Sequence, residues 1–178
     1  MSQPWSAVNM VIANEGGLST DELDPGGITN MGISLRFLKE VDPEKLRKYG
    51  IHVPVTEETI RELNRPQVEA IYTCEFWDFF RFKELDDQLL ANYVFDCAIN
   101  PNPASAFRFL QRAIWTYAGY EKCKDDGIMG SKTIALANAY GRCLIRPMMS
   151  ERAGWYRQHA NERYLDGWLR RAYREPFE

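Results

Sequence analysis

One stretch of turn-forming residues, between positions 16 and 33, interrupts a chain whose apolar residues otherwise recur at helical spacing. Before it, Trp5, Val8, Ile12 and Glu15 share one side of a repeat of about 3.6 residues, and a pair of glycines then ends the helix. From residue 18 to residue 33 the sequence is rich in Asp, Asn, Pro and Gly. It therefore predicts a small β-hairpin or loop excursion near residues 18–33, with short strands.

The rest of the chain predicts helices with clear start signals. Ser34 is expected to cap a helix that begins at Leu35, Asp42-Pro43 opens another, and a third begins near Thr56. Further helices are expected from Pro66 to Trp77, over residues 87–98, 104–117, 148–164 and 166–174, and after the turn at 125–133, where Ser131 is the expected cap. We predict a mainly α, lysozyme-like α+β fold: a helical bundle with one small hairpin. At 178 residues, the regions 1–95 and 96–178 are expected to pack into one compact globule.

Composition excludes several classes of protein. Hydrophobic residues make up 45% and charged residues 26%, as in folded soluble proteins. No stretch approaches the roughly 20 apolar residues that a membrane helix needs, so no integral membrane segment is expected. The N-terminus lacks a basic segment followed by an apolar one, so we expect no signal peptide and a protein that is cytoplasmic until it is released.

Cysteine and histidine usage argues against a metal site. The four cysteines are widely spaced, form no CxxC pair, and are expected to be small buried hydrophobic residues. With only His52 and His159 available, a zinc site is not expected, and no cofactor is implied.

The net charge of -3 is unevenly distributed along the chain. Residues 1–100 carry 9 Lys/Arg and 17 Asp/Glu, or -8, while residues 101–140 carry +2 and residues 141–178 carry +3. All eight basic residues of the last segment are arginines. They favour contact with an anionic polymer, although a solvated helix face explains them equally well, and nothing indicates nucleic acid.

Glu15 stands at the predicted end of the first helix, on the face that Val8 and Ile12 share. The negative end of the helix dipole and the apolar neighbours both favour the protonated carboxylic acid, which is the form that a general acid needs. Asp24 follows nine positions later in a polar, glycine-rich loop where it is expected to stay ionised. Two carboxyl groups in such different environments indicate an acid and a base, although Asp before Pro-Gly is also a common turn former.

The run EGGLSTDELDPGGITNMGIS resembles the opening motif of glycoside hydrolase family 108, the N-acetylmuramidases typical of phage endolysins. The family pattern is Glu-Gly-Gly-Tyr followed by Asp-Pro-Gly-Gly-x-Thr-Asn-x-Gly-Ile, and this chain departs from it with Leu18 in place of the tyrosine. The matching positions are Glu15, Gly16, Gly17, Asp24, Pro25, Gly26, Gly27, Thr29, Asn30, Gly32 and Ile33.

The resemblance continues over roughly residues 5–173. IYTCEFWD resembles the family's Tyr-x-x-x-Tyr-Trp segment, with Phe76 in the second tyrosine's place, and FDCAIN and LQRAI are similar to family segments further on. DGIMGSKT, ERAGWY and GWLRR resemble the family's peptidoglycan-binding-like second half. The family usually has Gly after Asn100, where this chain has Pro101-Asn102-Pro103 and therefore a stiffer loop.

The resemblance implies hydrolysis of the β-1,4 bond between N-acetylmuramic acid and N-acetylglucosamine in peptidoglycan. It also implies a catalytic muramidase region over residues 1–95 and a helical, peptidoglycan-binding-like region over residues 96–178. It makes Glu15 the catalytic acid and, by analogy with another phage lysozyme group, Asp24 the base or water-positioning residue and Thr29 its hydrogen-bonding helper. Such a pair should invert the anomeric centre, with carboxyl groups about 6.5–9.5 Å apart, whereas about 5–5.5 Å would indicate retention. The expected partners are peptidoglycan glycan strands and, for a phage-encoded protein, a separate holin-type release protein; we expect a monomer.

Residue type suggests further contacts with sugar. Aromatic rings and amide side chains commonly bind sugar rings, and Asn30, beside the catalytic loop, also fits a simple turn-closing role. Trp115 and Tyr117 qualify by type, although Trp115 lies in an apolar run that favours core packing. The expected substrate-binding residues are Asn30, Tyr72, Trp77 and Asn100.

Other functions stay open at this point. A lytic transglycosylase also uses a lone Glu, and it differs by forming 1,6-anhydro products. A Cys-His peptidase has little support, because no cysteine here stands in a nucleophile signature. A catalytically silent wall-binding or secretion-associated protein would be expected to lose its acid, and Glu15 is intact. The Arg-rich C-terminal helices could contact either anionic wall polymers or lipid headgroups.

Overall fold

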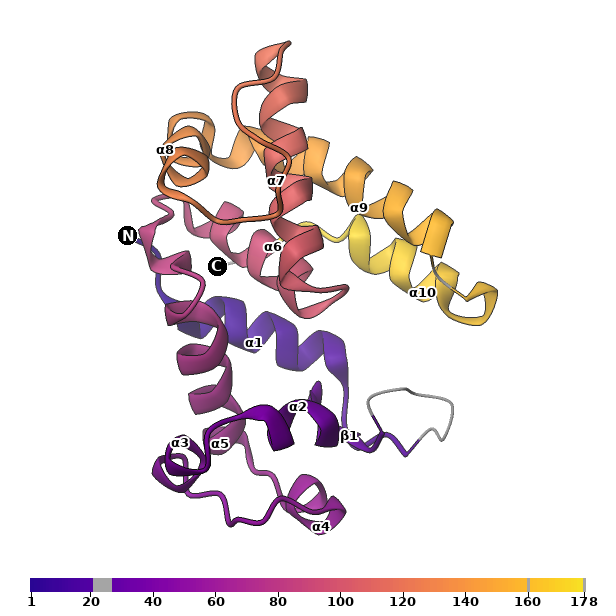
Figure 1. Ribbon diagram of the computed structural model, residues 1–178. Coiled ribbons are helices and arrows are strands. Elements are labelled where there is room, and N and C mark those ends of the chain that lie inside the picture. The colour runs from indigo at the N-terminus through magenta and orange to yellow at the C-terminus, as the bar shows by residue number, and fades with distance from the viewer. Residues whose placement is uncertain (21–26, 160, 178) are drawn as a thin grey trace. The chain divides into compact units, whose positions relative to one another are not determined.

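The computed structural model describes residues 1–20, 27–159 and 161–177 (Figure 1). Contacts divide the chain into two compact units. Val11–Phe79 form the first, called here the hairpin unit, and Met1–Met10 together with Phe80–Glu178 form the second, called the helical unit. Helix α1 (Pro4–Glu15) contributes residues to both. The division into regions 1–95 and 96–178 rests on sequence motifs. It stays a prediction, because the two compact units are defined by contacts and do not test it.

The hairpin unit consists of short elements whose starts follow from their capping residues. The elements after α1 are β1 (Thr29–Asn30), β2 (Ile33–Ser34), α2 (Leu35–Glu40), α3 (Pro43–Lys48), α4 (Glu57–Arg61), α5 (Arg65–Ile71) and the π-helix η1 (Tyr72–Asp78). Ser34 accepts a hydrogen bond from Phe37 N, as predicted, and Asp42 accepts one from Glu44 N. Thr56 caps α4 in a reciprocal capping box, so all three predicted helix starts are confirmed.

The two strands form a tight antiparallel hairpin. Thr29 pairs with Ser34 and Asn30 with Ile33, which leaves Met31 and Gly32 as a two-residue turn. Both turn residues have positive φ, +47° at Met31 and +80° at Gly32, as a type I′ turn requires. Ser19 forms an isolated bridge to Thr29. The predicted hairpin is thus confirmed in the part of residues 18–33 that the structure describes.

Apolar residues from each element of the hairpin unit form its core. Ile33 follows the turn and is buried, and it shares the interior with residues from α2, α4, α5 and η1. These residues are Leu38, Ile60, Val68, Ile71, Tyr72 and Trp77. Burying such a side chain stabilises the fold by about 1.5–3 kcal/mol. Burial of Ile33 therefore holds the hairpin on the core of this unit.

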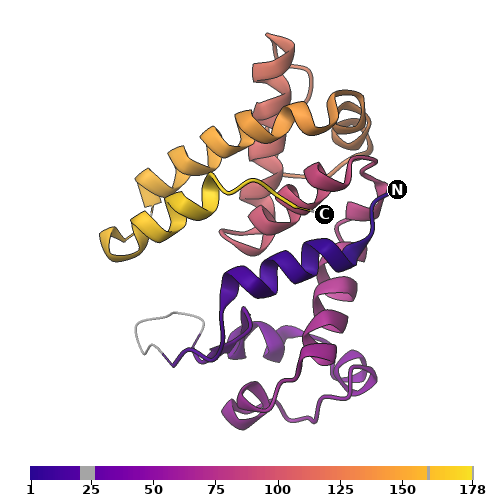
Figure 2. The ribbon, with the colours of Figure 1, turned by 180° about the vertical axis from the view of Figure 1, so that it is seen from behind.

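The helical unit contains the longer helices. After the 3-10 helix η2 (Phe82–Glu84) come α6 (Gln88–Ile99), α7 (Pro103–Ala118), α8 (Ser131–Tyr140), the 3-10 helix η3 (Gly141–Leu144), α9 (Ile145–His159) and α10 (Glu162–Ala172). Helix α7 packs against both α6 and α9, and α10 packs along α9. Figure 2 shows α9 and α10 side by side as in Figure 1. Every residue of α6 from Leu90 to Ala98 is buried, which makes α6 the centre of this unit.

One buried carboxylate joins three of these helices. Asp96 of α6 accepts hydrogen bonds from Arg152 of α9 at 2.7 Å and from Arg171 of α10 at 2.7 Å. Burial would raise the pKa of Asp96, but the positive charges of the two arginines outweigh it and lower this pKa to about 2. Asp96 therefore stays ionised and ties the C-terminal helices to α6.

The structure corrects three predictions about the helices. Ser131 is the first residue of α8 and not its cap, because Gly130 occupies the cap position and offers no side chain. The helix expected from Pro66 to Trp77 changes to a π-helix at Tyr72, and apolar spacing alone does not distinguish the two helix types. The expected helix over 148–164 runs from Ile145 to His159 instead, because Asn161 caps a new helix by accepting from Arg163 N.

The mainly α, lysozyme-like fold is confirmed, with its small antiparallel hairpin. Within residues 1–20, 27–159 and 161–177, no helix combines the length and the apolar character that crossing a bilayer requires.

Candidate active site

Glu15 is the last residue of α1 and its side chain is half-buried. Gly16 follows with a φ of +74°, a left-handed conformation that ends the helix there. The helix thus holds the carboxyl group at its C-terminal end, in the hairpin unit.

The side chain of Glu15 lies against the β1–β2 turn and against Tyr72. A Cβ atom added to Gly32 would lie 2.7 Å from Cγ of Glu15 and 2.3 Å from the hydroxyl oxygen of Tyr72. Side chains do not tolerate such distances, and the φ of +80° at Gly32 is one that L residues rarely adopt. Glycine at position 32 therefore lets Glu15, the turn and Tyr72 meet at one point.

Tyr72 supports this turn from the interior. It is the first residue of η1, is 1% exposed, and donates a hydrogen bond from its hydroxyl to the carbonyl oxygen of Met31 at 2.9 Å. Met31 is a non-glycine residue with positive φ, a strained conformation that costs about 1–3 kcal/mol and needs surrounding contacts to persist. Tyr72 supplies one such contact beside Glu15, while its predicted contact with a sugar stays a prediction.

Thr29 and Asn30 lie on the first strand of the hairpin, as the motif predicts. The Thr29 hydroxyl donates to the carbonyl oxygen of Gly27 at 3.2 Å. Asn30 is buried, at 8% exposure, and its Nδ2 donates to the carbonyl oxygen of Ile60 at 2.9 Å. The Asn30 amide thus ties the hairpin to α4, and the predicted roles of both residues in catalysis and binding stay predictions.

The other predicted site residues have different surroundings. Trp77 is 1% exposed in η1, in the core of the hairpin unit. Asp24 lies outside the described residues. Asn100 belongs to the helical unit, where its carbonyl oxygen accepts from Arg152 at 2.6 Å and its Oδ1 accepts from the Tyr156 hydroxyl at 2.9 Å. Arg152 and Tyr156 therefore fix the orientation of Asn100.

Sequence reasoning missed two of these relations. It counted Gly32 as part of a motif without assigning it a role, although a Met-Gly pair between two short strands is a signal for a hairpin turn. It also missed that Arg152 and Tyr156 hold Asn100, because those residues follow it by more than 50 positions and no local pattern links them.

The prediction that all four cysteines are buried is wrong, because Cys97 and Cys123 are buried but Cys74 and Cys143 are exposed. Burial raises the pKa of Cys97 to about 12 and also raises the pKa of Cys123, so both thiols are poor nucleophiles. Among the residues that the structure describes, no three His, Cys, Asp or Glu side chains are arranged to hold a metal ion.

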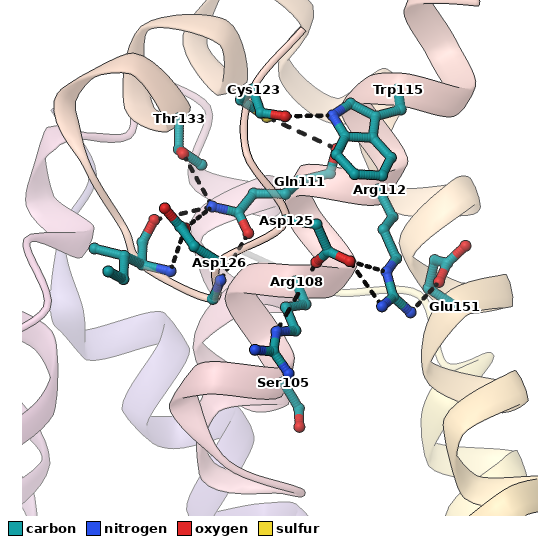
Figure 3. A network of polar contacts seen from close by, with 12 residues as sticks. Ser105, Arg108, Gln111, Arg112, Trp115, Cys123, Asp125, Asp126, Thr133 and Glu151 are labelled. Carbon is teal, nitrogen blue, oxygen red and sulfur yellow. Dashed lines mark hydrogen bonds and ion pairs between the residues drawn. The ribbon is translucent and has the colours of Figure 1, made fainter. Parts of the chain in front are cut away.

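The DGIMG turn of the helical unit is a scaffold held by one buried glutamine (Figure 3). Gln111 of α7 accepts from Gly127 N at 3.0 Å, and its Nε2 donates to Asp126 at 2.8 Å and to the carbonyl oxygen of Ile128 at 3.1 Å. Figure 3 also shows Arg112 of α7 directed at Asp125, which it contacts through two nitrogen atoms at 2.8 and 2.9 Å. Both contacts attach the turn to α7.

Comparison with known families shows which protein family the chain belongs to. Residues 8–101 match the family described as glycosyl hydrolase 108, which is more than half of the chain. The chain belongs to the glycosyl hydrolase 108 family. Residues 105–173 match a second family, described as a predicted peptidoglycan domain. The resemblance inferred from the sequence is therefore confirmed, and the two matches together support a glycoside hydrolase whose partner is peptidoglycan.

The fold is similar to that of a solved protein, Brucella abortus SagA. The two chains are 25% identical and superpose with a TM-score of 0.71, over 95% of this chain and 88% of that one. No match was found among curated proteins.

Proposed function

We propose that this glycosyl hydrolase 108 protein is a muramidase, cleaving the β-1,4 bond between N-acetylmuramic acid and N-acetylglucosamine in peptidoglycan with Glu15 as the general acid. The observation that carries the proposal is the place of Glu15. It ends α1 half-buried, next to a turn that only glycine at position 32 permits, and beside a buried tyrosine hydroxyl. An acid that must meet a glycosidic oxygen needs this kind of fixed placement.

The reaction consumes one water molecule. Glu15 gives its proton to the glycosidic oxygen while the bond from that oxygen to the anomeric carbon breaks, so the leaving sugar departs with a hydroxyl group. A water oxygen bonds to the anomeric carbon and loses a proton to the second carboxylate, for which we propose Asp24. We propose that Thr29, on β1, holds this water by hydrogen bonding.

Glu15→Gln tests the central claim. Glutamine keeps the shape of the side chain and removes the proton, so hydrolysis of dye-labelled sacculi should fall by about 10²–10⁴-fold. Glu58→Gln is the matched control, because Glu58 is an exposed glutamate in the same unit, in the first turn of α4. Undiminished hydrolysis by Glu15→Gln, with both variants folded, would overturn the proposal.

The products separate a hydrolase from a lytic transglycosylase. Hydrolysis leaves reducing muramic acid ends, and mass spectrometry of digested sacculi should show them. Transglycosylation would instead give 1,6-anhydro ends, lighter by one water. A wall-binding protein without activity would release neither product.

Anomeric NMR of the first product tests the role of Asp24. Inversion is expected if Asp24 activates a water molecule, and Asp24→Asn should then lower the rate without changing the anomer formed. A retained anomer would contradict the inverting route while leaving Glu15 as the acid.

Several finer features stay predictions. Contacts of sugar with Asn30, Tyr72, Trp77 and Asn100 would appear as a raised KM in single variants that circular dichroism shows to be folded. A role in phage-mediated lysis, with release from the cytoplasm by a holin-type protein, and a monomeric state are each open to direct measurement.

A further inference from the structure

Three tyrosine rings gather on the helical unit where α7 and α8 end. Tyr117 is 51% exposed and Tyr120 is 61% exposed, and Tyr140, the last residue of α8, is half-buried. The Tyr117 and Tyr140 ring centroids are 5.1 Å apart in an edge-on arrangement. The ammonium nitrogen of Lys122 lies 5.1 Å from the Tyr120 centroid and 5.9 Å from that of Tyr140. These four residues are called the tyrosine patch.

The chain segment that carries Tyr120 and Lys122 is fixed to α7 by hydrogen bonds. Gly119 ends α7 in a left-handed conformation, with its N–H donating to the carbonyl oxygen of Trp115 at 2.8 Å. The Trp115 indole in turn donates to the carbonyl oxygen of Cys123 at 2.8 Å. The segment that carries Tyr120 and Lys122 is therefore fastened to α7 at both ends, which lowers the entropic cost of binding a ligand there.

The patch joins exposed aromatic faces to a positioned positive charge. Hydrogen bonds with Tyr120 and Tyr140 raise the pKa of Lys122, so its ammonium group is charged at neutral pH. No carboxylate in the described part of the chain forms an ion pair with Lys122. Exposed aromatic rings with polar tips favour ligands that have both an apolar face and hydroxyl or amide groups, as sugars do. The positive charge of Lys122 beside them adds a preference for a carboxylate.

We propose that the tyrosine patch is a non-catalytic binding surface for the glycan strands of peptidoglycan. Tyr117 and Tyr120 stack against the apolar faces of the N-acetylated sugars, and Lys122 pairs with a carboxylate of the lactyl-peptide substituent. The patch falls within residues 105–173, the segment that matches a predicted peptidoglycan domain. The proposal shares its polymer with the proposed function, but it needs no contribution from Glu15. Its role is to keep the enzyme on the wall between cleavages.

Binding to purified sacculi tests the proposal, with Glu15→Gln as the background to limit digestion. Tyr117→Ala/Tyr120→Ala should weaken sedimentation with sacculi by at least about tenfold, which corresponds to about 1.4 kcal/mol. Tyr173→Ala is the matched control, because Tyr173 is 50% exposed in the same unit but lies at the end of α10. Tyr117→Phe/Tyr120→Phe keeps the stacking faces and should bind nearly as well as the background. Binding unchanged in the alanine variant would overturn the proposal.

Lys122→Met removes the positive charge and leaves the tyrosine rings in place. This variant tests the proposal if the alanine variant does not fold. It should weaken binding to sacculi at low salt and lose this effect at high salt, because salt screens exposed charges. On a soluble N-acetylglucosamine oligosaccharide, which has no carboxylate, Lys122→Met should bind as the background does. Equal binding of Lys122→Met and the background to sacculi would contradict the assigned contact with a carboxylate.

Failure of this proposal is distinguishable from failure of the proposed function. If Glu15→Gln hydrolyses sacculi as fast as the parent, the muramidase assignment of Glu15 fails, while binding measured in the cold still reports on the patch. If the patch variants bind normally, the patch proposal fails, and hydrolysis of short soluble glycans by the parent chain is unaffected.

Discussion

Gly32→Ala should damage both stability and catalysis, because the β1–β2 turn leaves no room for a side chain beside the acid. The added Cβ would lie 2.3 Å from the Tyr72 hydroxyl oxygen, 2.7 Å from Cγ of Glu15 and 3.1 Å from Cβ of Glu15. Tyr72 cannot easily retreat, since it is 1% exposed and its hydroxyl is bonded to the Met31 carbonyl oxygen. The strain therefore falls on the turn and on Glu15.

The size of the effect follows from these distances. A left-handed backbone in an L residue costs about 1–2 kcal/mol, and overpacking a filled site costs about 1–3 kcal/mol more. The free energy of unfolding should thus fall by about 2–5 kcal/mol. To restore ordinary contact at about 3.4 Å, Cγ of Glu15 must move by about 0.7 Å from its 2.7 Å position. Misplacing a catalytic group by about 1 Å lowers the rate on the order of 10²-fold, so kcat should fall by somewhat less than that.

Variants of two other glycines separate the effect of steric overlap in Gly32→Ala from the effect of backbone strain. Gly17→Ala adds a Cβ with no heavy atom within 4 Å and without a left-handed φ, so it should leave stability and activity nearly unchanged. Gly119→Ala has the unfavourable φ, at +78°, with nothing within 4 Å, so it should lose only about 1–2 kcal/mol of stability. The double variant Gly32→Ala/Tyr72→Phe removes the closest atom and should recover part of the stability, but not the placement of Glu15.

Urea unfolding monitored by circular dichroism and dye release from labelled sacculi measure the two effects. A Gly32→Ala protein that unfolds at the parent's urea concentration and hydrolyses sacculi at the parent's rate would refute the reasoning. So would equal losses in Gly32→Ala and Gly119→Ala, because backbone strain alone would then account for them.

Two further predictions concern the helical unit. Asp96→Asn leaves the buried Arg152 and the partly buried Arg171 without their carboxylate and should cost about 3–5 kcal/mol in urea unfolding at neutral pH. The folded pKa of Asp96 is lowered from 3.8 to about 2, so its stabilisation, on the order of 2 kcal/mol, should be present above pH 4 and lost as the pH falls through about 2; a parent protein with no such acid-dependent loss would contradict this. In the folded protein, iodoacetamide should label the exposed Cys74 and Cys143 before Cys97, whose pKa burial raises to about 12, and peptide mapping showing equal labelling would argue against that burial.

Most helix starts in the hairpin unit were predictable from the sequence, because a cap acts within three residues. Ser34, Asp42 and Thr56 each accept a hydrogen bond from a backbone N–H two or three positions later. The same local rule failed at Ser131, where the neighbouring Gly130 occupies the cap position. It was also overlooked at Asn161, which divides the two C-terminal helices.

Glu15 was predictable as a candidate acid, since a helical face, a glycine stop and a family motif coincide there. Its surroundings were not predictable in the same way. Gly32 follows Glu15 by 17 positions and Tyr72 follows Gly32 by 40, and no periodic pattern relates such separations. Likewise, Asp96 meets arginines 56 and 75 positions away.

The sequence by itself therefore determined the helical class, the hairpin near the front, the family and the residue that we propose as the acid. Only the tertiary structure decided that Gly32 and Tyr72 enclose Glu15, that two arginines share Asp96, and that Tyr117, Tyr120 and Tyr140 gather around Lys122. The physical reason is the separation along the chain of the residues that interact. Caps, turns and helical faces depend on neighbours within one or two turns of chain, whereas packing brings together side chains whose separation along the chain carries no signal.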